Sequence, residues 1–247
     1  MKLLSIVTIV RNDIVGFRNT HESLKNKPRW VEWIVIDGAS IDGTVGFIDN
    51  HSSEIDFFLS EKDVGIADAF NKGVKNSSGK FVIFINAGDI LRDDFFYSAE
   101  LIITDLKNNE CSIGVSKIKF GDEIVGKSIG AEKQKIRNYL PHQGMIIKKD
   151  FFDKYGLYDI KYKLGMDYEW SLRFIHDWEN EMNFYGYILT EMEPNGVSIT
   201  NFKETFKSYH RARIKNKTLP FCLSLCCTYL MIYKRSIGIF VRKFFNH

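Results

Sequence analysis

The segment LLSIVTIV, residues 3–10, decides the fold class of this chain. It is apolar and β-branched almost throughout, which is typical of a strand covered on both faces of a parallel sheet. Residues 33–36 (WIVI) and 81–85 (FVIFI) repeat this character. Between these strands, residues 42–50 and 65–75 have the patterns of helices. The alternation predicts βαβ units, and therefore an α/β fold with a mostly parallel sheet flanked by helices.

Charge divides the chain into two parts. Residues 1–201 hold 24 Lys and Arg against 30 Asp and Glu, whereas residues 202–247 hold 10 against 1. The length of 247 residues allows one large core with an appendage. We therefore predict an α/β domain over 1–201 and a basic, amphipathic, helical C-terminal extension over 202–247. A basic tail favours an anionic partner, such as a membrane surface or nucleic acid.

The tail contains an uncharged stretch, residues 219–233, followed by Lys234 and Arg235. This stretch is too short to span a bilayer core of about 30 Å comfortably. Apolar residues flanked by Lys and Arg suit a helix that lies in the headgroup region of an anionic leaflet. A helix packed on the domain and a homodimer contact through C-terminal helices are the alternatives. Nucleic acid is disfavoured, because no recognised binding motif accompanies the charge.

The cysteines and the N-terminus indicate a cytoplasmic chain, peripheral on the inner face of the cell membrane if the tail binds lipid. Cys111, Cys222, Cys226 and Cys227 show neither paired metal-ligand spacing nor the spread of a disulfide framework. The N-terminal apolar run has one preceding basic residue and no small-residue cleavage site, so it is interpreted as a buried strand and not a signal peptide.

Polar residues follow the predicted strands. Thr8 and Arg11 lie at the exit of the first strand, Asp37 ends the second, and residues 86–89 (NAGD) follow the third. Ligands of open parallel sheets bind beyond the carboxyl ends of the strands. A carboxylate such as Asp89 beside a glycine suits a hard cation, because Mg²⁺ and Mn²⁺ prefer oxygen ligands. The alternative is a turn in which Asp89 caps the next helix.

The order of these motifs resembles that of the family 2 glycosyltransferases, which have the Rossmann-like GT-A fold. Within that family the resemblance is to bacterial colanic acid, O-antigen and exopolysaccharide transferases, and it covers residues 3–173. The motifs are SIVT (5–8) with RND (11–13), EWIVIDGAS (32–40) with DGT (42–44), DVGIADAFNKG (63–73) and NAGD (86–89).

The resemblance implies transfer of a sugar from a UDP- or GDP-sugar donor, with inversion, to a saccharide acceptor. The acceptor is expected to be lipid-linked, in surface polysaccharide synthesis. Asp89 would bind the Mn²⁺ or Mg²⁺ ion. The implied donor-binding residues are Thr8, Arg11, Asp37, Asp68, Lys72, Asn86, Ala87, Gly88, His142 and Gln143. Lys72 would supply charge near the diphosphate, or would be a solvated helix residue.

Several positions depart from the family pattern. Asn86 and Gly88 stand where the family usually has carboxylates, Gly38 replaces a common second Asp, and Phe70 replaces an Arg found in many relatives. These departures bear on metal binding, base selectivity and neutralisation of phosphate.

Asp167, in the segment MDYEW (166–170), matches the acidic residue that acts as general base in the resembling family. An inverting transfer needs such a carboxylate to remove the proton of the acceptor hydroxyl. The alternative is that Asp167 is a helix N-cap. Of the other histidines, His51, His176 and His210 have no partner at ligand spacing and are predicted to be surface residues.

Three other functions have less support in the sequence. A nucleotidyltransferase normally has a glycine-rich loop after the first strand, and residues 10–13 (VRND) lack that glycine. A dinucleotide-dependent oxidoreductase needs G-x-G-x-x-G at the same place, which is also missing. A catalytically weak nucleotide-sugar-binding or scaffold protein of the same fold stays open, because Asn86 and Gly88 lack carboxylates.

Overall fold

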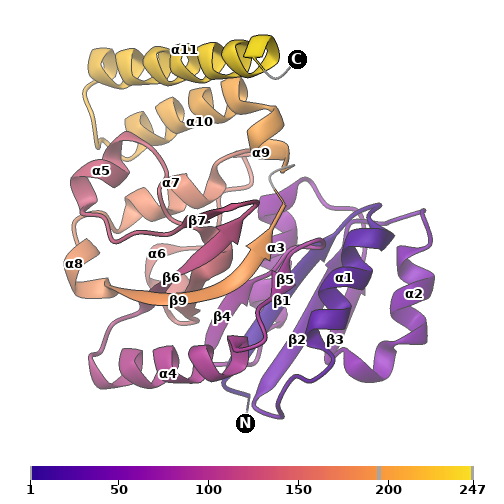
Figure 1. The fold of residues 1–247 in the computed structure, drawn as a ribbon. Helices are drawn as coiled ribbons and strands as arrows, with labels where there is room; N and C mark the ends of the chain where they lie inside the picture. Colours follow the sequence, from indigo (N-terminus) through magenta and orange to yellow (C-terminus); the bar gives the residue numbers. More distant parts are fainter. Residues whose placement is uncertain (1, 194–195, 246–247) are drawn as a thin grey trace.

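One twisted, mixed sheet runs through the protein, and helices cover both of its faces (Figure 1). The structure is a computed structural model that describes residues 2–193 and 196–245. The strands are β1 (Leu4–Val10), β2 (Val31–Asp37), β3 (Phe57–Ser60), β4 (Phe81–Phe84), β5 (Ile90–Leu91), β6 (Ile113–Phe120), β7 (Glu123–Val125), β8 (Met145–Lys148) and β9 (Met182–Met192).

The helices alternate with strands in the N-terminal half and follow one another in the C-terminal half. They are α1 (Ile14–Leu24), α2 (Thr44–Asn50), η1 (Ser52–Glu54), α3 (Ile66–Asn76), α4 (Phe95–Asn108), α5 (Ala131–Ile136), η2 (His142–Gly144), α6 (Phe151–Tyr155), α7 (Met166–Arg173), α8 (Trp178–Glu181), α9 (Val197–Thr200), α10 (Phe202–Lys215) and α11 (Phe221–Phe245).

The strand order is β3-β2-β1-β4-β8-β6-β9-β5, and β7 pairs with β6. Strands β1 to β4 are parallel, with Leu4 of β1 opposite Val31 of β2 and Phe81 of β4. Strand β8 is antiparallel to both β4 and β6, and β6 is parallel to β9. Strands β1, β4, β6 and β9 therefore run in the same direction, so that their carboxyl ends meet at one edge of the sheet. The predicted α/β fold with a mostly parallel sheet is confirmed.

Each face of the sheet has its own apolar core. Val7 and Ile36 face the core under α3, α6 and α7, whereas the neighbouring Ile6 and Val35 face the core under α1, α2 and α4. Because successive side chains of a strand point to opposite faces, a strand buried on both sides must be apolar at consecutive positions. This explains the continuous apolar run of residues 3–10.

The helix expected over 65–75 is α3, residues 66–76, whereas the other expected helix is shorter than the sequence indicated. The helix expected over 42–50 begins at Thr44, because Gly43 has φ +97° and ends the preceding turn in a left-handed conformation. The helix that contains Asp167 ends at Arg173, and α8 begins separately at Trp178.

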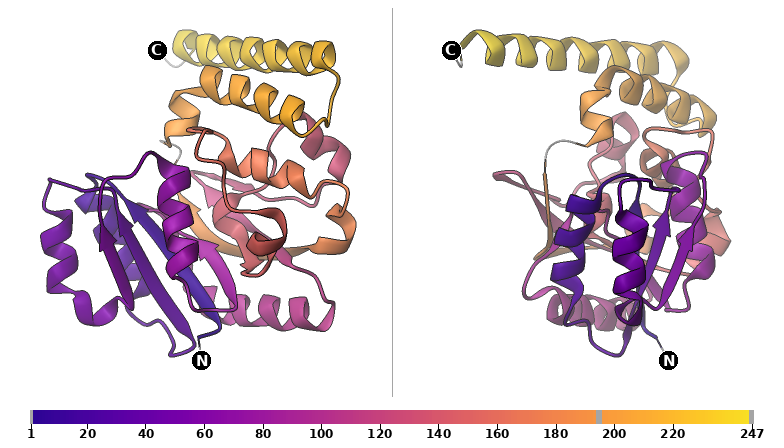
Figure 2. Two further views of the ribbon diagram at one scale, coloured as in Figure 1. Left: turned by 180° about the vertical axis from the view of Figure 1, so that it is seen from behind. Right: turned by 90° about the vertical axis from the view of Figure 1, so that its right-hand side faces the viewer.

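Helices α10 and α11 form two further layers beyond α7, with α11 outermost (Figures 1 and 2). Ser208 Oγ of α10 donates to the carbonyl of Leu164 at 2.6 Å, just before α7. The buried guanidinium of Arg213 in α10 donates to Oγ of Ser224 at 2.9 Å in α11. The basic extension is thus built onto the α/β domain through α10. No helix among the described residues is long and apolar enough to cross a membrane.

Candidate active site

A cleft of about 1260 Å³ opens at the edge where the carboxyl ends of the strands meet. One wall comes from the ends of β1 and β4 and the start of α3, and the other comes from β6, the segment 137–143 and the start of α7. Asp89 and Asp167 both line this cleft, although 78 residues separate them in the sequence. The two acidic residues singled out from the sequence therefore line one cavity.

The turn that carries Asp89 is shaped by Gly88 and by a hydroxyl from α1. Gly88 has φ +94°, a left-handed conformation that disfavours residues with a side chain. Thr20 Oγ donates to the carbonyl of Asp89 at 2.7 Å and accepts from the amide of Gly88 at 3.0 Å. The next helix, α4, is capped by Asp94 and not by Asp89. The helix-cap alternative for Asp89 is therefore wrong.

The carboxylate of Asp89 is almost completely buried, with 5% of the residue exposed. Burial raises the pKa of Asp89 from 3.8 to about 7, against the lowering effect of hydrogen bonds from the amide of Asn86 and the side chain of Gln143. Asp89 is thus half protonated near pH 7. Any cation bound there would favour the ionised form, because it compensates the charge that burial makes unfavourable.

The corner around Asp89 is rich in oxygen atoms. Asn86 Oδ1 is buried beside it and has no hydrogen-bond partner among the described residues. Asp13, which caps α1 through a hydrogen bond from the amide of Gly16 at 2.9 Å, lines the same part of the cleft. An unpaired buried amide oxygen and a carboxylate fit a hard cation, which prefers oxygen ligands and commonly shares substrate phosphates as further ligands.

Asp167 is the second residue of α7 and is partly exposed to the cleft. The cap of α7 is Gly165, so the N-cap alternative for Asp167 is wrong. Asn138 Nδ2 donates to Asp167 Oδ2 at 2.6 Å. Desolvation raises the pKa of Asp167, and the hydrogen bonds from the amide of Tyr168 and from Asn138 oppose this rise. A carboxylate with a raised pKa is a stronger base than one in water.

Helix α10 supports the segment that presents Asp167. Gly165 has φ +70°, and a β-carbon added there would lie 2.7 Å from the ring of Tyr209 in α10. The rings of Tyr168 and Tyr209 pack with their centroids 4.3 Å apart. The C-terminal extension, predicted to be basic, amphipathic and helical, therefore helps to position the start of α7 through α10.

Of the predicted donor-binding residues at the ends of β1 and β2, one lies at the cleft and the other is buried behind it. Arg11 is exposed and lines the cleft. Asp37 is buried behind it, where one carboxylate oxygen accepts from the amide of Ser40 at 2.9 Å and from Ser60 Oγ at 2.6 Å. The other oxygen, Oδ1, has no hydrogen-bond partner among the described residues. Asp63, which the sequence reasoning did not select, borders the cleft beside Arg11.

Like Asp37, three more predicted donor-binding residues do not line the cleft, and these expectations are corrected. Thr8 is fully buried on the α1 face of β1, where its hydroxyl accepts from Trp33 Nε1 at 2.9 Å. Asp68 and Lys72 are one turn apart on α3, away from the cleft, and form an ion pair at 3.3 Å. Lys72 also pairs with Glu61 at 2.8 Å. Lys72 is therefore a half-buried, ion-paired helix residue, which neither alternative described.

The segment containing His142 and Gln143 borders the cleft between its two walls. The ring of His142 stacks on Phe84 with centroids 4.7 Å apart, and its Nε2 lies 2.8 Å from the hydroxyl of Tyr158. Burial lowers the pKa of His142 to about 3, so the ring is neutral. His142 thus shapes the floor of the cleft, whereas Gln143 and the backbone of Ala87 and Gly88 face the region of Asp89.

The structure adds cationic residues that the sequence reasoning missed. Lys127, Arg137 and Lys163 are exposed and line the cleft together with Arg11. The guanidinium of Arg137 lies 4.4 Å from the centre of the Tyr139 ring. A basic residue close to the HQG segment was the available signal for Arg137. For Lys127 and Lys163 no local signal distinguishes them from solvated lysines.

The described geometry defines a class of protein: an α/β enzyme with an acidic and cationic cleft at the carboxyl edge of its sheet. A family model described as "Glycosyl transferase family 2" matches residues 5–99. An uncharacterized glycosyltransferase of Mycobacterium tuberculosis is 28% identical over 183 residues, which cover 69% of this chain and 68% of the relative. A PGL/p-HBAD biosynthesis glycosyltransferase of Mycobacterium bovis is 24% identical, over 58% of this chain and 57% of the relative.

Solved structures share the fold. TarS 1–349 of S. aureus in complex with UDP-GlcNAc has a TM-score of 0.68 and 13% identity, covering 91% of this chain and 69% of that one. The mannosyltransferase PcManGT from Pyrobaculum calidifontis, in complex with GDP-Man and Mn²⁺, has a TM-score of 0.65 and 11% identity, covering 95% and 75%. This chain spans 41% of a longer TarS structure. Residues 5–99 match the family 2 glycosyltransferase domain, and the chain is a glycosyltransferase with the GT-A-type fold.

Proposed function

We propose that this glycosyltransferase acts by inversion, with Asp167 as the general base and Asp89 at the leaving-group side of the reaction. The observation that carries this proposal is the single cleft that both residues line. In an inverting transfer the acceptor hydroxyl attacks the anomeric carbon from the face opposite the departing diphosphate. A base and a cation-binding carboxylate that line one cleft are compatible with that requirement.

The chain's own residues have distinct tasks in this reaction. Asp167 takes the proton of the acceptor hydroxyl as the new glycosidic bond forms, and its raised pKa favours that transfer. Asn138 holds the carboxylate of Asp167 in place through the bond to Oδ2. Arg11, Lys127 and Arg137 offer positive charge to the departing nucleoside diphosphate.

Asp89 and Asn86 would hold a Mn²⁺ or Mg²⁺ ion, with Asp13 nearby. Such an ion, when bound, supplies positive charge that stabilises the leaving diphosphate. The PcManGT structure was obtained with Mn²⁺. Because Asn86 and Gly88 bring no carboxylate, we expect weak metal binding without the donor and tighter binding with it.

The donor is proposed to be a UDP- or GDP-sugar. The solved relatives of the same fold bind UDP-GlcNAc and GDP-Man. The nucleoside would lie near Arg11 and Asp63, which both line the cleft. Thermal stabilisation by UDP-, GDP- and dTDP-sugars, with and without Mn²⁺, would identify the base. Equal effects of all three would contradict a selective nucleoside pocket.

The acceptor is proposed to be a lipid-linked saccharide in bacterial surface polysaccharide synthesis, reached at the cytoplasmic face of the membrane. Helix α11 supports this proposal, because two of its polar residues face inwards while several large apolar side chains are exposed. Ser224 and Thr228 are buried against Arg213, whereas Tyr229, Leu230 and Tyr233 are 58–65% exposed. Helices of soluble domains normally bury their apolar stripe. An anionic leaflet suits both this exposed face and the basic residues of the extension.

Membrane binding can be tested with vesicles of phosphatidylglycerol and of phosphatidylcholine. Deletion of residues 219–247 should release the protein from the anionic vesicles. Because this deletion also exposes Arg213, the double variant Leu230→Glu/Tyr233→Glu tests the same face with the helix retained. Ile160→Glu, which alters an exposed apolar residue outside α11, is the control. Retention of the double variant would contradict the proposal. Its conversion from dimer to monomer, without any change in vesicle binding, would favour the homodimer alternative.

The catalytic proposal is tested by Asp167→Asn. This variant should bind the donor with unchanged affinity, measured by calorimetry, and should lose transfer to acceptor. Slow hydrolysis of the nucleotide sugar by the wild-type protein in the presence of Mn²⁺ would separate an active transferase from the catalytically weak binding or scaffold protein. Unimpaired turnover by Asp167→Asn would refute its role as base.

A further inference from the structure

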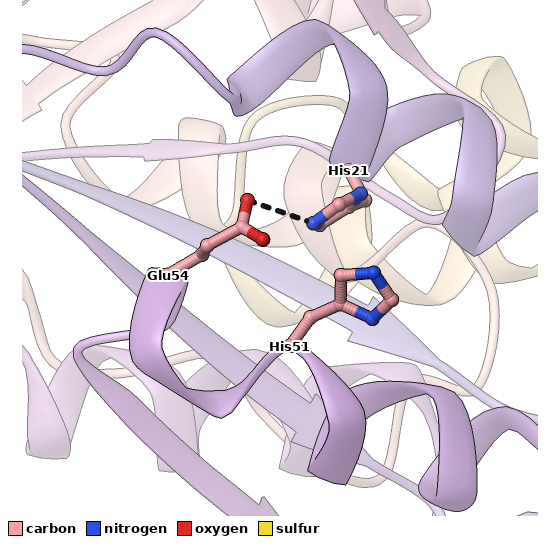
Figure 3. Close-up of side chains that lie close together, drawn as sticks. All are labelled: His21, His51 and Glu54. Atoms are coloured by element: carbon pink, nitrogen blue, oxygen red, sulfur yellow. Dashed lines mark hydrogen bonds and ion pairs between the residues drawn. The ribbon is translucent and has the colours of Figure 1, made fainter.

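A second group of metal-ligand side chains lies outside the cleft. His21 of α1, His51 at the end of α2 and Glu54 of η1 point towards one another (Figure 3). Their nearest ligand atoms all lie within 4.8 Å of one another. Among the described residues this is the one group of three His, Cys, Asp or Glu side chains with that spacing. His51, predicted from the sequence to be an isolated surface residue, is in fact half-buried in this group.

We propose that His21, His51 and Glu54 form a binding site for Zn²⁺ or a similar transition-metal ion. Two imidazoles and one carboxylate, with a water molecule as a fourth ligand, are a ligand set that Zn²⁺ accepts. Imidazole ligands bind Zn²⁺, Co²⁺ and Ni²⁺ more tightly than they bind Mg²⁺ and Mn²⁺. The site would therefore select a different class of ion from the oxygen-rich corner at Asp89.

A hydrogen bond to the backbone leaves one ring nitrogen of His51 able to bind a metal ion. Its Nδ1 lies 2.9 Å from the backbone carbonyl of Phe47. A carbonyl oxygen only accepts, so Nδ1 carries the hydrogen and Nε2 keeps its lone pair. Metal-binding histidines commonly use their other ring nitrogen in this way, which fixes the tautomer and the ring orientation.

The spacing requires only a small movement. Ligand atoms around a four-coordinate ion with bonds of about 2.0–2.2 Å lie about 3.3 Å apart. His21 Nε2 and Glu54 Oε2 are 3.0 Å apart, which is close to that separation. His51 therefore has to approach by roughly 1.5 Å or less, from the limit of 4.8 Å. On metal binding, the hydrogen that Nε2 of His21 shares with Glu54 moves to Nδ1 of the same ring.

Aromatic packing holds the three side chains in this arrangement. Phe47 stacks on His51 with centroids 4.2 Å apart and meets His21 edge-on at 5.3 Å. Trp33 lies 5.8 Å from the ring of His21 on the side of the core. An ion bound here would join α1 to α2 and η1. The first turn of α1 lines the cleft, so an ion bound at this site would restrict the movement of that part of the cleft.

The test uses the full chain carrying Asp89→Asn, so that the carboxylate of the cleft does not contribute to binding. After treatment with EDTA, Zn²⁺ binding is measured by calorimetry, and Co²⁺ binding is measured by its visible absorption. We expect one Zn²⁺ per chain, a rise in the melting temperature with Zn²⁺, and no competition from excess Mg²⁺. His51→Ala should weaken binding by about tenfold or more, because even substitutions behind metal ligands commonly cost that much.

His176→Ala, which removes an exposed histidine outside the group, is the matched control and should bind as the parent does. Glu54→Gln provides a second test that keeps the size of the side chain, should His51→Ala fail to fold. Binding of Zn²⁺ with equal affinity by the parent and by either ligand variant would overturn the proposal, as would the absence of Zn²⁺ binding by the parent. Neither result depends on transferase activity, so the proposed function is tested separately.

Discussion

Asp89→Asn should stabilise the metal-free protein while it abolishes metal-dependent transfer. Burial raises the pKa of Asp89 from 3.8 to about 7, so the folded state holds the proton more tightly than the unfolded state does. Below pH 3.8 both states are protonated, and the residue has no effect on stability. As the pH rises towards 7, the unfolded state loses the proton first, and the folded state becomes relatively less stable.

The size of this effect follows from the pKa difference. One pKa unit corresponds to about 1.4 kcal/mol, so the buried carboxyl group of Asp89 lowers the free energy of unfolding by about 2 kcal/mol at pH 5 and about 4 kcal/mol at pH 8. An asparagine keeps an oxygen that can accept from the amide of Asn86, and its amide can bond Gln143. The substitution therefore removes the buried charge without leaving a hydrogen-bond partner unpaired.

The assay is urea unfolding in EDTA at pH 5 and pH 8, compared with Asp93→Asn, which changes an exposed aspartate four residues away. We expect Asp89→Asn to gain more stability at pH 8 than at pH 5, and the control to change little at either pH. Saturating Mn²⁺ should reduce the difference in the free energy of unfolding between Asp89→Asn and wild type, because the ion stabilises only the protein that has the carboxylate. An Asp89→Asn protein that is no more stable than wild type at pH 8 would refute the buried-carboxylate reasoning.

Three further predictions follow from the surroundings of Asp167 and from the extension. Asn138→Leu removes the hydrogen bond to Asp167 Oδ2, so the pKa of Asp167 should rise further and the acidic limb of the pH–rate profile should move to higher pH; an unchanged profile would argue against the positioning role. Gly165→Ala should cost about 2 kcal/mol or more in urea unfolding, because φ is +70° and the new β-carbon meets Tyr209; a neutral effect would show that α7 can move freely. Arg213→Met should loosen α11 and speed proteolysis within it, because Arg213 is the buried donor to that helix; unchanged proteolysis would contradict this.

Local patterns were sufficient for the strands and for the positions of the acidic residues. Residues 3–10 are apolar at consecutive positions, and this pattern needs no knowledge of distant contacts to indicate a strand buried on both faces. The turn after β4 and the start of α7 are also local features. Their meeting in one cleft was inferred from the rule that strand ends converge, and the cleft contains both Asp89 and Asp167.

Side-chain direction was the main source of error. Thr8 was placed at the exit of the first strand, but β1 continues to Val10, and the alternation of strand side chains turns Thr8 towards Trp33. Lys72 is expected from the sequence to lie near the diphosphate. It forms an ion pair instead with Asp68, which lies one turn away on α3. In both cases a residue of suitable chemistry lies in the right element and on the wrong side of it.

By itself, the sequence determined the α/β class, the order of the motifs and the presence of a basic extension, because these depend on hydrophobic period, local turn chemistry and composition. Only the tertiary structure decided that α10 supports the start of α7, that α11 turns its apolar face outwards, and that His51 joins His21 and Glu54. These features depend on contacts between segments far apart in the chain. The free energy of such contacts comes from packing and burial, which no short stretch of sequence contains.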